Sequence, residues 1–323
     1  MNILITGTAG FIGSALAKKL CENGLKVIGI DNHNDYYDTN LKLSRVKLLL
    51  SHNNYKHYEC DIANKIEMSK IFLEEKPNIV FNLAAQAGVR YSIEYPQSYI
   101  DSNISGFQNI LDLSKETKVS HVIYASSSSV YGLGNSLPYS VKDRVDRPVS
   151  IYAVSKKTNE LMAHVYSHMY KLPTTGLRFF TVYGPWGRPD MAAWIFTKAI
   201  FSDEVFNVFN YGKHSRDFTY IDDIISGLVG VMNSVPVGDT PYKIYNIGNN
   251  KAELLTDFIS YLEKYIGKKA KVSYLNMQPG DVKDTHADID DIKKDIGFKP
   301  TTELKYGLKK FVNWYAKYHD INI

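Results

Sequence analysis

The sequence predicts an α/β protein in which a doubly wound parallel sheet is followed by a smaller mixed lobe. Apolar, strand-like runs alternate with helix-period segments through the first half of the 323-residue chain. The first run leads directly into a glycine-rich turn, and after residue 178 the alternation gives way to loops rich in glycine, proline and aromatic residues. Strands joined by helical crossovers lie parallel, so we expect a sheet that is covered on both faces.

Each element of this alternation has its own segment. Strands are expected at residues 2–6, 26–30, 55–59, 79–83, 121–125 and 174–178. Helices are expected between them at 11–23, 40–51, 65–75, 96–117 and 150–170, and later at 192–202, 222–233, 255–266 and 302–318. No long linker interrupts the chain, so we expect residues 1–180 to form one domain and 181–323 mainly a second lobe, with segments near 214–235 returning to the first.

Composition and charge exclude several classes of protein. The chain has 38 Lys and Arg against 34 Asp and Glu without a basic block, so we expect no nucleic-acid partner. Cys21 and Cys60 have neither disulfide-framework nor metal-ligand spacing, which predicts no metal site and a reducing, cytoplasmic setting. The N-terminus lacks a basic leader and no apolar run reaches the roughly 18 residues of a membrane span, so we expect a soluble protein with no membrane partner.

A glycine turn follows the first predicted strand and opens the first helix. Gly7, Gly10 and Gly13 allow the backbone to bend and approach a pyrophosphate, whose charge a helix N-terminus favours. Asp31 ends the second strand, where a carboxylate accepts hydrogen bonds from ribose hydroxyls and repels a 2′-phosphate. The pattern therefore predicts NAD and not NADP. The alternatives are glycines that only close a turn and an aspartate that only caps a strand.

Tyr152 and Lys156 stand four residues apart on a predicted helix, so their side chains share one face. A nearby ammonium and an oxidised nicotinamide favour the phenolate, which would make Tyr152 a general base near neutral pH. A chance pair on an exposed helix face is the alternative, since the chain has 24 tyrosines. Ser127 and Ser128 favour the catalytic interpretation, because the strand end that carries them faces the ligand crevice of a doubly wound sheet. A polar loop would also contain such serines.

The chain resembles the extended short-chain dehydrogenases/reductases that act on nucleotide sugars, and among them the UDP-glucuronate 4-epimerases. The motifs that carry the resemblance are TGTAGFIG, NLAAQAGVRYS, YASSSSVYG, YAVSK, RFFTVYGPWGRPDMA and RDFTYIDD. They occur in family order and extend from Met1 to about Tyr318. The resemblance implies a Rossmann-like NAD-binding domain and a smaller lobe that binds the nucleotide sugar.

The resemblance also implies a role for each matching residue. The glycine turn would hold the pyrophosphate with amides of Phe11 and Ile12, while Asp31 and Asn32 would contact the adenosine ribose and Asp61 and Ile62 the adenine. Further cofactor contacts are expected from Leu83, Ala84, Ala85, Gln86, Asn103, Tyr152, Lys156 and Tyr183. The expected catalytic residues are Tyr152, Lys156, Ser127 and Ser128.

The implied reaction is a transient oxidation at C4 of the sugar, through a 4-keto intermediate. No electrons are lost overall, so NAD⁺ is expected to stay tightly bound through turnover. Related dehydratases and decarboxylases typically carry an acidic residue after the catalytic hydroxyl, where this chain has Ser128 and Ser129. Without that acid, simple epimerisation is favoured.

A uronic acid needs donors for its carboxylate, because burying an unpaired charge is costly. Thr181 replaces an Asn that is common in UDP-hexose epimerases, and we expect it to bind the carboxylate with Ser127 and Ser128. Arg90 or Arg188 would assist, although either could form an ordinary ion pair. The resemblance assigns the rest of the UDP moiety to Val208, Arg216, Gln278 and Asp281, with Gln278 replacing a frequent Arg.

The predicted reaction is therefore the conversion of UDP-glucuronate into UDP-galacturonate, for polysaccharide biosynthesis. UDP-glucose or an N-acetylated hexosamine or uronate is the alternative substrate, and a non-catalytic NAD-binding regulator is the alternative from another class. The predicted helices at residues 96–117 and 150–170 resemble the pair through which family members form a homodimer as a four-helix bundle.

Overall fold

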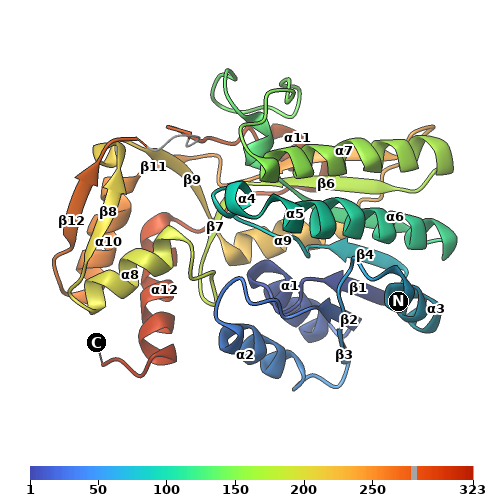
Figure 1. Cartoon of the computed structure of the whole chain (residues 1–323), viewed down its shortest axis with the longest axis horizontal. Coiled ribbons are helices and arrows are strands. Elements are labelled where there is room, and N and C mark those ends of the chain that lie inside the picture. The colour runs from blue at the N-terminus through green and yellow to red at the C-terminus, as the bar shows by residue number, and fades with distance from the viewer. Residues whose placement is uncertain (278–281, 323) are drawn as a thin grey trace.

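A seven-stranded parallel sheet forms the centre of the computed structural model, which describes residues 1–277 and 282–322 (Figure 1). Its strand order is β10-β6-β5-β4-β1-β2-β3, with every neighbouring pair parallel. The strands are β1 (Asn2–Thr6), β2 (Lys26–Asp31), β3 (Tyr55–Glu59), β4 (Ile79–Asn82), β5 (His121–Ser127), β6 (Thr174–Phe179) and β10 (Tyr242–Ile247). The predicted doubly wound α/β fold is confirmed, and all six predicted strands are present.

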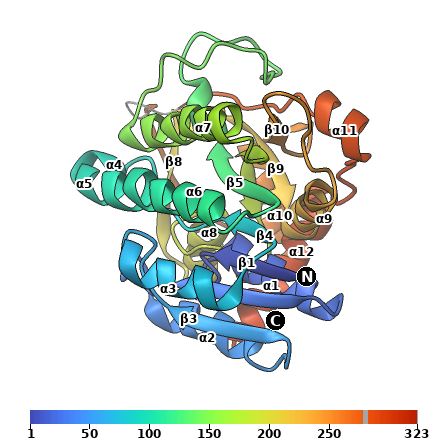
Figure 2. The same ribbon diagram turned by 90° about the vertical axis from the view of Figure 1, so that its right-hand side faces the viewer.

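Alternate residues of the strands enter two different cores, as the two-residue period of a strand requires. Ile3 and Ile5 of β1 belong to one apolar cluster and Leu4 belongs to the other. The cluster of Leu4 contains residues from α3 (Lys65–Glu75), α6 (Gly106–Glu116) and α7 (Ile151–Tyr170). The cluster of Ile3 contains residues from α1 (Phe11–Glu22) and α9 (Ile221–Met232), and Figure 2 shows the two helical layers on opposite sides of the sheet.

Polar side chains fix where several of the predicted helices begin. The Ser150 hydroxyl accepts a hydrogen bond from the Ala153 amide at the start of α7, at 3.1 Å. Asp38 caps α2 (Thr39–Leu49) through the Asn40 amide, and Asn64 caps α3 through the Glu67 amide. Such caps satisfy amides that have no partner within the helix, so they give the sequence a recognisable start signal.

The predicted helix at residues 96–117 is helical but not uniform. Regular turns of α5 (Pro96–Tyr99) and α6 are joined by the π-helical turn η1 (Ile100–Ser105), which contains Asn103. A π turn inserts an extra residue per turn and changes the direction of the side chains that follow, and such turns are frequent at functional sites. Helix α4 (Tyr91–Glu94), which precedes this region, was not predicted.

The second lobe contains two small sheets that the sequence analysis did not predict. Strands β7 (Thr181–Tyr183), β9 (Ser215–Tyr220) and β11 (Ala252–Leu254) form one sheet, and β8 (Val205–Phe209) pairs with β12 (Lys271–Leu275) in the other. The predicted helices appear as α8 (Ala192–Phe201), α10 (Leu255–Ile266) and α12 (Leu304–Tyr318), which pack on one another (Figure 1). The short elements η2 (Ser128–Tyr131), η3 (Asn210–Gly212) and α11 (Asp290–Ile296) complete the described chain.

The chain returns from the second lobe to the first after residue 220. Helix α9 packs against α1 and β5, and β10 pairs with β6 along six residues, although β9 itself belongs to the small sheet with β7. Strand β10 was not predicted from the sequence. Within residues 1–277 and 282–322, no helix combines the length and apolar content that crossing a bilayer demands.

Candidate active site

A cavity of about 430 Å³ lies where the strands of the large sheet end, between the two lobes. Ligands bind at this carboxyl edge in open α/β sheets. Nineteen of the residues named from the sequence line the cavity: Gly7, Gly10, Phe11, Ile12, Gly13, Asp31, Asn32, Asp61, Ile62, Leu83, Ala84, Ala85, Gln86, Ser127, Ser128, Tyr152, Lys156, Thr181 and Arg188. The structure thus brings together segments that lie far apart in the sequence.

The glycine turn has no room for side chains. Gly7 has a φ of +80°, and a Cβ added there would lie 2.8 Å from the Ala84 amide nitrogen. A Cβ on Gly13 would lie 2.1 Å from the Gly7 carbonyl oxygen. Gly10, the N-cap of α1, makes no side-chain cap, so the first amides of that helix remain open to the cavity. This bare backbone beside a helix N-terminus fits the pyrophosphate of a dinucleotide.

Asp31 is held in place by backbone donors at the end of β2. Its carboxylate accepts hydrogen bonds from the Ala9 and His33 amides, each at 2.9 Å, and it still lines the cavity. The Asn32 amide group donates to Asp61 Oδ2 at 2.8 Å, which joins the ends of β2 and β3. The fixed carboxylate and the neighbouring amide suit the hydroxyls of a ribose.

Gln86 presents a donor that the described protein does not use. Its side-chain nitrogen is buried and has no hydrogen-bond partner among the residues that the structure describes, and the residue lines the cavity. Asn103 fixes the Gln86 backbone, accepting from its amide at 2.7 Å and donating to its carbonyl at 3.0 Å. Asn103 itself is buried outside the cavity lining. An unpaired buried donor is costly, so it favours a ligand that accepts there. The residues present therefore fit NAD.

Tyr152 and Lys156 lie in the first two turns of α7 and both line the cavity. Lys156 is almost fully buried, and its ammonium donates to the Ala125 carbonyl at 2.8 Å. Burial lowers the pKa of Lys156 to about 8. Burial also raises the pKa of Tyr152, while a hydrogen bond with Ser127 and the charge of Arg188 act in the opposite direction. Without the charge of an oxidised nicotinamide, burial therefore favours the neutral phenol, and the expectation that the lysine and NAD⁺ together favour the phenolate stays a prediction.

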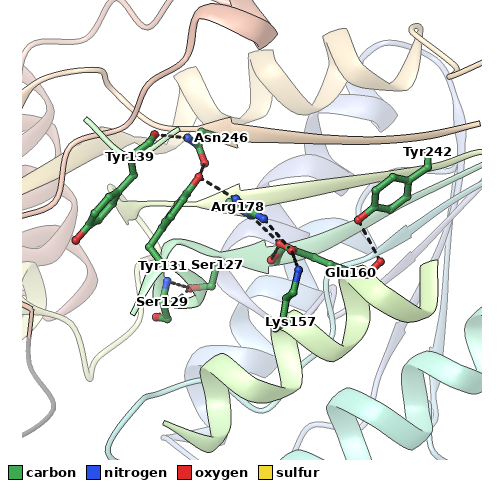
Figure 3. A network of polar contacts seen from close by, with 10 residues as sticks. Ser127, Ser129, Tyr131, Tyr139, Lys157, Glu160, Arg178, Tyr242 and Asn246 are labelled. Carbon is green, nitrogen blue, oxygen red and sulfur yellow. Dashed lines mark hydrogen bonds and ion pairs between the residues drawn. The ribbon is translucent and has the colours of Figure 1, made fainter. Parts of the chain in front are cut away.

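The serine segment is held by a buried network behind the cavity (Figure 3). Ser126 donates to Glu160 Oε1 at 2.7 Å, and the Arg178 guanidinium binds both oxygens of Glu160 at 2.8 and 2.9 Å. At the start of η2, the Ser127 hydroxyl accepts from the Ser129 amide at 3.1 Å. Because Glu160 lies one turn beyond Lys156 on α7, this network fixes the end of β5 against the helix that carries the tyrosine.

Thr181 and Arg188 line the same cavity as Tyr152, and the charge of Arg188 acts on the tyrosine. Asp190 binds the Arg188 guanidinium with two contacts, Nε to Oδ1 at 2.9 Å and Nη2 to Oδ2 at 2.5 Å. Arg90 lies instead over the Phe209 ring, with 5.4 Å between the guanidinium carbon and the ring centroid, and it is not part of the lining. Of the two arginines named for a carboxylate, the structure thus places Arg188 beside the tyrosine.

Several residues named from the sequence lie elsewhere. Val208 is 1% exposed and Tyr183 is 3% exposed; both belong to an apolar cluster and neither is among the cavity-lining residues, so their predicted ligand contacts stay predictions. Arg216 lies outside the lining and donates to the carbonyls of Lys283 and Ser215, at 2.6 and 3.1 Å. Gln278 and Asp281 fall outside the residues that the structure describes.

Other residues that were not predicted from the sequence also line the cavity. Tyr36 and Tyr37 belong to the segment that follows Asp31 and leads into α2, and Lys42 lies in α2 itself. Loops after the carboxyl ends of strands line the crevice in this fold, so that position was a usable signal. Met191 follows Arg188 in the loop between β7 and α8 and was missed as well.

Comparisons with known proteins agree with this arrangement. The model of the NAD dependent epimerase/dehydratase family matches residues 3–248. Protein CapI of Staphylococcus aureus is 52% identical over 99% of both chains, and UDP-glucuronate 4-epimerase 2 of Arabidopsis thaliana is 44% identical over 99% of this chain and 76% of its own.

Among solved structures, UDP-glucuronic acid 4-epimerase from Bacillus cereus, in complex with UDP-glucuronic acid and NAD, has a TM-score of 0.92 and 36% identity. The match covers 98% of this chain and 100% of that one. The predicted family and the predicted cofactor are thereby confirmed. The chain belongs to the NAD dependent epimerase/dehydratase family.

Proposed function

We propose that this protein is an NAD-dependent isomerase that epimerises a UDP-sugar at C4, converting UDP-glucuronate into UDP-galacturonate through a 4-keto intermediate. One observation carries the proposal: a tyrosine, a lysine and a serine meet an arginine at one end of a cavity whose other end is a dinucleotide cradle. The similarity to UDP-glucuronate 4-epimerases of a plant and a bacterium supports the same reaction.

The cofactor would be held by the glycine turn, by Asp31 and Asn32 at the adenosine ribose, and by the free Gln86 nitrogen. When bound, NAD supplies reversible hydride acceptance at C4. A net isomerisation leaves it unchanged, so we expect NAD to remain in the protein as NAD⁺ between turnovers. The Asp31 carboxylate disfavours a 2′-phosphate, which supports NAD over NADP.

Tyr152 would remove the proton of the sugar O4 and return it after the ring has turned over. Its phenol lies close enough to Ser127 for their hydrogen bond to lower its pKa, and the charge of Arg188 acts in the same direction. Burial opposes both effects, so further positive charge is needed to ionise the phenol. Lys156, on the same face of α7, would supply part of it while binding the nicotinamide ribose.

The uronate carboxylate would bind to Arg188, with hydroxyls of Thr181, Ser127 and Ser128 as further donors. All four residues line the cavity near Tyr152, and C5, which bears the carboxylate, is next to C4 in the ring. A buried carboxylate needs a charged partner, whereas a neutral sugar does not. The Arg216 guanidinium remains our candidate for the diphosphate.

The test is turnover without added cofactor. The nucleotide released by denaturing the purified protein is identified by mass spectrometry, and untreated protein is incubated with UDP-glucuronate or UDP-glucose alone. We expect released NAD⁺ and formation of UDP-galacturonate, resolved by chromatography. Equal or faster conversion of UDP-glucose would overturn the uronate assignment, and no epimer from either sugar would overturn the reaction itself.

We further propose a homodimer formed through a four-helix bundle of the helical segments 96–116 and 151–170. Helix α7 exposes Val154, Leu161, Val165 and Met169, which follow a helical period and form one apolar stripe. Ile100 of the adjacent π turn is exposed as well. Sedimentation that shows only monomer at micromolar concentration would contradict this.

We place the activity in the cytoplasm, in the synthesis of polysaccharide precursors. The two buried free cysteines agree with a reducing compartment.

A further inference from the structure

A polar bridge connects the two lobes beside the cavity. The Tyr36 hydroxyl, from the segment after β2, donates to Asp190 Oδ2 at 3.0 Å, and Asp190 lies in the loop after β7. The same carboxylate binds the Arg188 guanidinium through two contacts. Tyr36 and Arg188 both line the cavity, so the bridge lies at the cavity wall.

The bridge fixes one edge of a planar cation. Asp190 uses Nε and Nη2 of Arg188, and a two-point contact with a rigid guanidinium sets its orientation as well as its distance. A guanidinium carries five N–H donors, so this contact leaves the Nη1 side for a second anion. Burial opposes ionisation of Asp190, but Arg188 and Tyr36 hold the pKa of Asp190 below its usual value, so the carboxylate stays charged.

A second contact holds the same loop from the same side of the molecule. Arg45 of α2 is 1% exposed and donates through Nη2 to the carbonyls of Trp186 and Gly187, at 2.7 and 3.1 Å. Through Nη1 it donates to the Ala9 carbonyl in the glycine turn at 2.8 Å. The cofactor lobe thus holds the loop on both sides of Arg188, by Arg45 before it and by Tyr36 after it.

We propose that Tyr36 and Asp190 are positioning residues that set the selectivity of the site for a uronate over a neutral hexose. They do so by holding Arg188 with its free edge toward the sugar carboxylate. The inference rests on the proposed function and adds to it two residues, Tyr36 and Asp190, to which the sequence motifs gave no role. Tyr36 lies five residues after Asp31, the proposed ligand of the adenosine ribose. Selectivity for the sugar would therefore depend on a segment that also contributes to cofactor binding.

Equilibrium binding separates this role from catalysis. In the NAD-loaded Tyr152→Phe protein, calorimetry measures the affinities for UDP-glucuronate and UDP-glucose, and their ratio is the readout. Adding Tyr36→Phe removes one hydroxyl that bonds a charged group, so we expect the ratio to fall about 5-fold, through weaker UDP-glucuronate binding. UDP-glucose affinity and NAD content should not change. Tyr95→Phe is the matched control, since its ring stacks on Tyr91 in the same aromatic cluster without entering the bridge.

A double substitution tests whether Tyr36 changes the affinity ratio through Arg188. If Tyr36 acts through Arg188, then Tyr36→Phe should leave the ratio unchanged once Arg188→Gln is present. The proposal is overturned if both sugars lose affinity equally, if the ratio does not move, or if the Tyr36 effect persists without Arg188. A parent protein that binds UDP-glucuronate no tighter than UDP-glucose would instead remove the uronate assignment itself, so the two failures are distinguishable.

Discussion

The two ends of the cavity are built in different ways. The cofactor end is made of backbone from one short turn, where the chain packs so closely that only glycine fits at residues 7 and 13. The sugar end is made of side chains from β5, α7, β7 and the loop after β7, including Ser127, Tyr152, Thr181 and Arg188. The first end depends on local backbone geometry, and the second depends on how distant segments pack. Each end should therefore fail in its own way.

Tyr152→Phe is expected to have the largest effect, suppressing the chemistry at the sugar end while leaving NAD binding at the cofactor end intact. Removal of a general base typically lowers turnover about 10²- to 10⁴-fold, while the glycine turn and Asp31 are untouched. Epimerisation of UDP-glucuronate, measured by chromatography, should fall by that factor while the NAD content of the purified protein stays at the wild-type level. Activity within a few-fold of wild type would remove Tyr152 from the mechanism.

Gly7→Ala should damage the opposite end. The new Cβ would lie 2.8 Å from a backbone nitrogen at a φ of +80°, so we expect loss of bound NAD and a fall of about 2–4 kcal/mol in the free energy of unfolding. Gly24→Ala is the matched control, because Gly24 has a φ of +79° with nothing within 4 Å. It should cost only about 1 kcal/mol in denaturant unfolding and retain NAD. Equal costs at both positions would show that crowding is not the cause.

Lys156 is proposed to act at both ends, on Tyr152 and on the nicotinamide ribose. Its burial predicts that the free energy of unfolding depends on pH. Its pKa of about 8 in the folded protein is below the usual 10.5, so between these values the unfolded chain binds more protons and stability rises with pH. Over the whole interval between the two pKa values, this effect raises the free energy of unfolding by about 3 kcal/mol. Denaturant unfolding of the wild type and of Lys156→Met between pH 7.5 and about 10 should show a steeper rise for the wild type. Parallel curves would contradict a lowered pKa.

The smallest effect is expected from Arg188→Gln, which sharpens the comparison within the sugar end. Loss of one charge-assisted contact with the carboxylate should lower kcat/KM for UDP-glucuronate about 10- to 30-fold. The value for UDP-glucose should change less than about 3-fold, since that sugar offers no charge to pair. Arg90→Gln serves as the control, because Arg90 lies on Phe209 outside the cavity. A similar loss for both sugars would mean that Arg188 supports the fold of the loop.

The same difference between the two ends explains what the sequence could predict. The first five strands and the helices around them follow strong local signals, such as apolar runs and capping residues like Ser150, and they appear where expected. The glycine turn and Asp31 were recognisable because their chemistry depends on neighbours in the sequence. The strands β7 and β11 have only three residues each, too few for a period to stand out.

Contacts between distant segments account for the rest. Tyr36 and Asp190 are 154 residues apart, and neither residue type indicates the other. Tyr183 and Val208 were placed toward a ligand by resemblance, but the direction of their side chains is set by the packing of β7 and β8. The raised pKa of Tyr152 is caused by burial, which no spacing of residues reveals.

Strand β10 has a consequence for how the protein is made. It pairs with all six residues of β6, yet residues 180–241 lie between the two strands in the chain. As the nascent polypeptide leaves the ribosome, β6 therefore remains an open edge until β10 itself, which follows α9, has been synthesised. Unpaired edges invite aggregation, so the most exposed moment in biogenesis comes late, and a fragment that stops at residue 180 would retain that hazard.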